Sequence, residues 1–77
     1  MTQIKIQDLL PLLRPGWVAA DGRGRWEWFA SRPKILNLNG IELWGATDAG
    51  IVMNLSCGFN IAPYDGDWKN SLMECGK

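Results

Sequence analysis

The chain opens with apolar residues at helical spacing, and it continues with short alternating segments that are typical of strands. Four apolar residues recur at positions i, i+3, i+4 and i+7: Ile6, Leu9, Leu10 and Leu13. Pro11 suits a first helical turn because it lacks a donor N–H, and Pro15 with the glycine after it is a stop signal. The pattern predicts a short helix that starts near Gln7 or Asp8 and ends near Arg14.

Two alternating segments each contain a glycine turn, and each predicts a β-hairpin. The first spans residues 17–29 with its turn at residues 21–24. The second spans residues 35–44 and turns at Asn39-Gly40, a strong signal for a two-residue hairpin loop. A short helix of this kind is unstable alone in water, so it is expected to pack on the sheet that the hairpins form.

The second half of the chain is less regular. Residues 51–55 and 59–61 predict one or two further strands, interrupted near Gly58. Asp67 is expected to cap a helical turn at residues 68–71, because its carboxylate can accept the free N–H groups there. A C-terminal strand is expected to complete the sheet.

These elements predict an α+β fold. A short N-terminal helix packs on a small twisted antiparallel sheet, which consists of the two hairpins and the C-terminal strand. A chain of 77 residues is expected to form one small domain over residues 1–77.

Five tryptophans in so short a chain are the main feature of its composition. Trp26 and Trp28 share one face of a strand, because side chains alternate, and this face is the better core candidate. A small domain lacks interior room for all five together with the other aromatic residues. Some tryptophans are therefore expected at the surface, where large aromatic side chains anchor partners.

Charge adds little to this picture, because eight basic and eight acidic residues give a formal net charge of zero. Residues 1–34 carry six basic and three acidic residues, whereas residues 35–77 carry two basic and five acidic ones. The molecule is polarised if the fold separates these halves. If their strands interleave, which we expect, the surface is mixed.

Several functions are disfavoured by what the sequence lacks. There is no histidine, so triads that need one are excluded, and no enzyme, cofactor or metal site is predicted. Asp65 and Asp67 are assigned to a turn rather than to acid–base catalysis. No apolar stretch approaches the roughly 20 residues of a membrane span, and no secretion signal is evident, which favours the cytoplasm and no membrane partner. Cys57 and Cys75 are then expected to be reduced, with a disulfide as the alternative in an exported protein.

The remaining candidate site combines aromatic residues with charged ones. The candidate binding residues are Arg23, Arg25, Trp28, Tyr64, Asp67 and Trp68. Tryptophan, tyrosine and arginine dominate protein interfaces, so a protein partner is the preferred interpretation. The same groups on a sheet stack bases in single-strand binders, but zero net charge disfavours nucleic acid. The structural alternative is that Trp26 and Trp28 are core and the arginines solvate the tip of a hairpin.

The chain also resembles small uncharacterised proteins of bacteriophages and prophages. The segments that carry the resemblance include Pro15-Gly16-Trp17-Val18-Ala19, Trp26-Glu27-Trp28-Phe29 and the terminal Gly66-Asp67-Trp68-Lys69-Asn70-Ser71-Leu72. At Asn70 many relatives are expected to have aspartate. The resemblance implies no activity and transfers no site, but it implies a protein made in the cytoplasm of a bacterial host.

The residues predict a protein-binding module without enzymatic activity, and the resemblance implies an accessory protein whose partner is a host protein. Two alternatives stay open: single-stranded nucleic-acid binding through the first hairpin, and a structural component that self-associates as a homo-oligomer.

Overall fold

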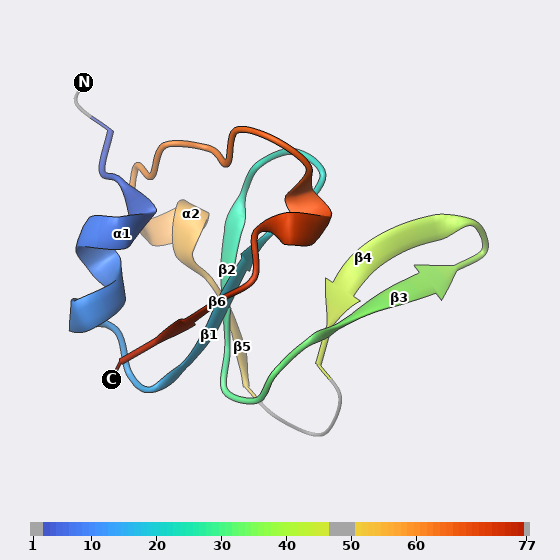
Figure 1. Ribbon diagram of the computed structural model, residues 1–77, viewed down its shortest axis with the longest axis horizontal. Helices are drawn as coiled ribbons and strands as arrows, with labels where there is room; N and C mark the ends of the chain where they lie inside the picture. The colour runs from blue at the N-terminus through green and yellow to red at the C-terminus, as the bar shows by residue number, and fades with distance from the viewer. Residues whose placement is uncertain (1–2, 47–50, 77) are drawn as a thin grey trace.

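A computed structural model describes residues 3–46 and 51–76 and confirms the α+β fold (Figure 1). The elements in chain order are helix α1 (Ile6–Leu9), the 3₁₀ turn η1 (Leu10–Leu12), β1 (Gly16–Ala20), β2 (Trp26–Phe29), β3 (Lys34–Leu38), β4 (Ile41–Gly45), β5 (Val52–Asn54), helix α2 (Leu55–Gly58), the 3₁₀ turn η2 (Trp68–Asn70) and β6 (Met73–Cys75). Four strands form an antiparallel sheet in the order β5-β2-β1-β6. Strands β5 and β6 from the second half of the chain flank β2 and β1 from the first half, so both halves contribute to one sheet, as expected.

The first hairpin, β1–β2, is the centre of the four-stranded sheet. Its turn is held by Asp21, whose Oδ1 accepts the backbone N–H groups of Arg23 at 2.9 Å and Arg25 at 3.0 Å. Gly24 has a φ of 82°, a conformation that costs glycine little. The predicted hairpin is thus confirmed, and its turn geometry follows from an aspartate and a glycine at the required positions.

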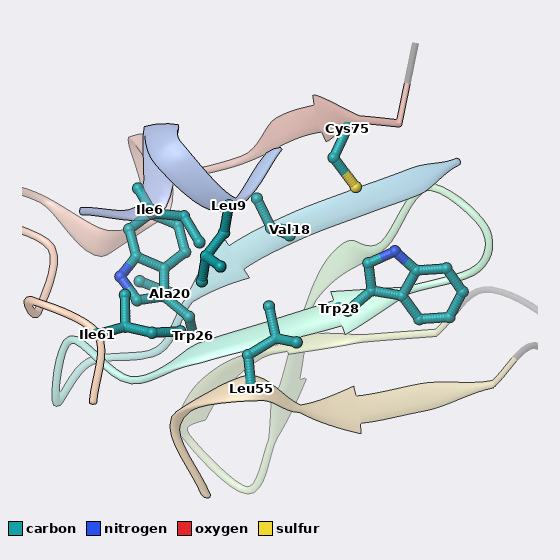
Figure 2. Close-up of a cluster of buried hydrophobic side chains, with 9 residues drawn as sticks. All are labelled: Ile6, Leu9, Val18, Ala20, Trp26, Trp28, Leu55, Ile61 and Cys75. Atoms are coloured by element: carbon teal, nitrogen blue, oxygen red, sulfur yellow. The ribbon is translucent and has the colours of Figure 1, made fainter. Parts of the chain in front are cut away.

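One face of this sheet packs against the N-terminal helix and forms the main core (Figure 2). The buried residues of this core are Ile6, Leu9, Val18, Ala20, Trp26, Trp28, Leu55, Ile61 and Cys75. Helix α1 is shorter than predicted, because Pro11 lies in the first turn of η1 and the chain continues as a 3₁₀ turn. The expected placement of Trp26 and Trp28 in the core is confirmed.

The opposite face of the sheet has a second, smaller core. Ala19, Phe29 and Trp44 are buried there, with Trp17, Trp68 and Leu72 packed against them. Trp44 comes from β4, so this core joins the second hairpin to the sheet. The central strand β1 therefore has packed side chains on both faces.

The second hairpin, β3–β4, has the predicted Asn39-Gly40 turn but not the predicted partners. Both turn residues have positive φ, 55° and 86°, and Asn37 Oδ1 accepts the Gly40 N–H at 2.9 Å. The hairpin forms a two-stranded sheet of its own rather than extending the larger sheet. It projects away from α1 and α2 (Figure 1). We call residues 34–45 the arm and the remaining described residues the body.

The C-terminal half differs from the prediction in one place and agrees in two. The first strand predicted after the arm shortens to β5 and passes directly into α2, and Ile61 forms only an isolated bridge with Ile4. The helical turn predicted after Asp67 is confirmed, because Asp67 Oδ1 accepts the Lys69 N–H at 3.1 Å. The predicted C-terminal strand is β6.

Candidate functional site

The tryptophans are less accessible than the sequence indicated. Trp26, Trp28 and Trp44 are 1%, 5% and 8% exposed, and Trp17 and Trp68 are half-buried. All five lie within the described residues, and the expectation that some of them reach the surface holds only in part, for Trp17 and Trp68. The large hydrophobic side chains that are exposed among the described residues are aliphatic or methionine, except for Phe59.

Trp28, a candidate binding residue, is buried in the structure. Its indole lies in the main core, and its Nε1 donates a hydrogen bond to the carbonyl oxygen of Arg14 at 3.1 Å. A large side chain with this burial and a satisfied N–H holds the loop before β1 in place. Its predicted role in a binding surface is therefore corrected to a role in the core.

The other candidate residues gather around the turn of the first hairpin. Arg23 and Arg25 are exposed at that turn. Tyr64 lies beside it, since its backbone N–H donates to the Gly24 carbonyl at 3.3 Å. The indole of Trp68 also lies beside this turn. A Cβ added to Gly22 would be 3.6 Å from Trp68 Nε1. The structure thus brings together residues that are far apart in the sequence.

The aromatic members of this cluster are fixed by the cores beneath them. Tyr64 packs edge-to-face on Trp26 with ring centroids 5.8 Å apart, and Trp26 Nε1 donates to the Ala62 carbonyl at 3.0 Å. Trp68 packs edge-to-face on Trp44 at 6.2 Å, and its carbonyl oxygen accepts from Trp44 Nε1 at 3.4 Å. Both side chains therefore stabilise the fold, and each presents only part of its ring to solvent.

The charges around the turn are mixed. Asp21 lies within the turn, and Asp65 and Asp67 follow in the neighbouring segment, so carboxylates accompany both arginines. Asp67 is exposed and its Oδ1 is engaged in the cap of η2. A surface of this composition offers no concentrated positive charge for phosphate groups.

The arm presents the apolar surface that the sequence interpretation missed. In the β3–β4 register Leu36 lies opposite Leu43, and Leu38 opposite Ile41, so these four side chains share one face. Leu38 is 56% and Ile41 is 67% exposed. We call Leu36, Leu38, Ile41 and Leu43 the arm face. Apolar residues alternate along both strands of this hairpin, and that pattern predicts a shared apolar face but not that the face is left uncovered.

The other face of the hairpin, which carries Trp44 and Glu42, is anchored to the body. Trp44 is buried in the second core, and Glu42 Oε1 pairs with Lys69 Nζ at 2.6 Å. This hydrogen bond from the ammonium to the carboxylate raises the pKa of Lys69. The contacts leave the arm face directed away from the anchor, because directly opposed pairs alternate between the two faces of a hairpin.

A second apolar surface lies at the β5 edge of the four-stranded sheet. Ile51, Val52, Met53 and Phe59 are 65%, 43%, 44% and 46% exposed. We call these four residues the edge patch. A shallow hollow of about 320 Å³ adjoins it and is lined by residues 56–61.

Two titratable groups of the body that are withdrawn from solvent, Glu27 and Cys75, have raised pKa values. Burial, with a smaller contribution from Asp21, raises the pKa of Glu27. Burial also raises the pKa of the Cys75 thiol, whose Sγ lies 3.5 Å from the Arg14 carbonyl oxygen. Cys57 is exposed, and both cysteines are free thiols. No group of three potential metal ligands occurs within residues 3–46 and 51–76.

Comparison of the chain with protein families, with curated proteins and with solved structures gives no match. Across the part of the chain that the structure describes, no helix is long and apolar enough to cross a membrane.

Proposed function

We propose that this protein is a non-enzymatic protein-binding module, and that its arm face docks on an apolar surface of a protein partner. The observation that carries the proposal is the arrangement of the arm. Four large aliphatic side chains share one face of a projecting hairpin, and the outermost two are more than half exposed. Large exposed apolar patches on a folded protein mark interaction sites.

The chemistry of the arm face favours a protein over other ligands. No charged residue occurs between Lys34 and Glu42. An uncharged aliphatic surface gains free energy by burying area against another apolar surface, whereas it gains nothing from phosphate groups. The partner is therefore a protein with an uncharged apolar groove or face.

The resemblance to phage and prophage proteins adds a setting to this proposal. In that setting the partner is a protein of the bacterial host, and the module acts by occupying a surface of that protein. Nucleic acid would have to bind elsewhere, at the turn with Arg23 and Arg25, where nearby carboxylates oppose it.

The test is affinity capture from a bacterial host lysate, with and without nuclease, read by mass spectrometry. The variant Leu38→Ser/Ile41→Ser removes the outer half of the arm face without touching Trp44. The matched control is Leu12→Ser, which changes an aliphatic residue of the body that is 78% exposed. We expect a nuclease-resistant partner that both the wild type and the control capture and the arm variant loses at least tenfold.

Two outcomes contradict the proposal. Equal capture by the arm variant places the interface elsewhere. Loss of all captured protein after nuclease treatment indicates a nucleic-acid ligand, and the turn with Arg23 and Arg25 would then be the site.

A further inference from the structure

The two outer strands of the four-stranded sheet differ in how their free edges are protected. Strand β6 carries the charged residue Glu74, and the N–H of Gly76 just beyond it donates to the Leu10 carbonyl of η1 at 3.1 Å. Charged side chains and covering segments are the usual means by which a sheet edge avoids another strand. Strand β5 has neither a lysine, a proline nor any charged residue, and all three of its residues are exposed.

The pairing of β5 with β2 determines which of its backbone groups remain free. The Ala30 N–H donates to the Ile51 carbonyl at 3.0 Å, so Ile51 is directed at the neighbouring strand. Hydrogen-bonding direction alternates along an antiparallel strand. The N–H and C=O of Val52, which lies opposite Phe29, are therefore directed away from the sheet toward solvent.

A strand with this arrangement can pair with a copy of itself. If a two-fold axis passes beside Val52, the Val52 N–H of each copy donates to the Val52 C=O of the other, and Ile51 of one copy lies opposite Met53 of the other. Such an isologous contact uses the same patch twice, so it requires a patch that does not repel itself. Residues 49–64 contain no charged residue, so no like charges of this segment would face each other across the axis.

The apolar area fits a weak dimer. The exposed parts of the edge patch amount to at most roughly 400 Å² on each copy, no more than about half of the roughly 800 Å² per partner found in stable interfaces. Backbone hydrogen bonds between paired strands add affinity to this area. Association of this size is reversible and depends on concentration.

We propose that two copies of this chain associate through their β5 edges, joining their four-stranded sheets into one continuous eight-stranded antiparallel sheet across a two-fold axis at Val52. This homodimer uses the edge patch and leaves the arm face free for the partner described above. It rests on backbone register and on the missing charges of β5, independently of the function of the arm.

The test is sedimentation equilibrium over protein concentrations from about 1 µM to about 1 mM, a range that brackets weak association. The wild type is expected to shift from the monomer mass of 8.6 kDa toward twice that value. The variants Val52→Lys and Val52→Glu each place like charges directly opposite each other, and each is expected to weaken association about tenfold or more. An equimolar mixture of the two variants is expected to recover the dimer, because lysine then faces glutamate.

The matched control is Ile41→Lys, which adds a charge at an exposed position on the arm, 67% exposed against 43% for Val52, and is expected to leave association through β5 unchanged. Tryptophan fluorescence verifies that each variant is folded. A wild type that stays monomeric throughout, a dimer that survives both Val52 variants, or a mixture that fails to recover the dimer would overturn the proposal. A dimer lost in Ile41→Lys but kept in the Val52 variants would also overturn it and would assign the contact to the arm.

Discussion

The two hairpins of this chain have similar local signals and opposite surroundings. In β1–β2, the apolar residues of both faces are covered, one face by α1 and α2 and the other by Trp44 and Trp68. In β3–β4, only Trp44 is buried, and all five residues of β3 are exposed. A turn and an alternating pattern specify a hairpin, but they do not specify what lies against it. The difference separates residues that stabilise the fold from residues that are free to bind.

The largest loss of stability is expected when a buried side chain of the first hairpin is truncated to alanine. Trp26 is 1% exposed and its indole N–H is hydrogen-bonded, so Trp26→Ala creates a large cavity in the main core. Such truncations cost about 3–5 kcal/mol, which is close to the whole stability of a small domain. We expect Trp26→Ala to be unfolded at 25 °C by far-UV and near-UV circular dichroism. A cooperative native-like melt with nearly unchanged midpoint would contradict the placement of Trp26 in the core.

An intermediate loss in the free energy of unfolding is expected when the buried hydroxyl of Ser71 is removed. Ser71 Oγ accepts the Ala20 N–H at 2.7 Å and donates to the Trp68 carbonyl at 2.6 Å, and it ties β1 to η2. Ser71→Ala leaves the Ala20 N–H buried without a partner, which costs about 1–3 kcal/mol. Asn37→Ala is the matched change in the arm, where Asn37 also accepts a backbone N–H but in solvent. In urea unfolding, Asn37→Ala should lower the free energy of unfolding clearly less than Ser71→Ala does. Equal losses would contradict the contrast between the two regions.

The sequence predicts local geometry well at turns and caps, where the conformation depends on a few neighbouring residues. Gly40 and Asn39 adopt the positive φ values that a two-residue turn needs, and Asp67 caps η2 as expected. The N-terminal α-helix is shorter than the apolar spacing predicts, because Pro11 lies in a 3₁₀ turn that follows it directly. The run after residue 50 was ambiguous because a short apolar segment fits a strand and a helix equally well, and it forms β5 and then α2.

The candidate site was predicted less well because accessibility depends on tertiary contacts. Trp28 and Trp68 have the residue type of an interface, yet one is buried and the other packs on Trp44. Leu38 and Ile41 have the residue type of a core, yet they are exposed on the arm. The proximity of Tyr64 and Trp68 to the first turn also depends on the path of the chain between residues 55 and 70. Periodicity assigns a residue to a face of its element, but it does not say whether another element covers that face.

The smallest effect is expected on the arm face, and it gives the most direct test of the claim that this surface serves binding rather than folding. The measurement is urea unfolding of the wild type and of Leu38→Ser/Ile41→Ser, followed by tryptophan fluorescence at a concentration where both are monomeric. Because both side chains are already exposed in the folded chain, the free energies of unfolding should agree within about 0.5 kcal/mol. A loss of about 2 kcal/mol or more would contradict the account, since it would mean that the arm face is packed in the folded monomer.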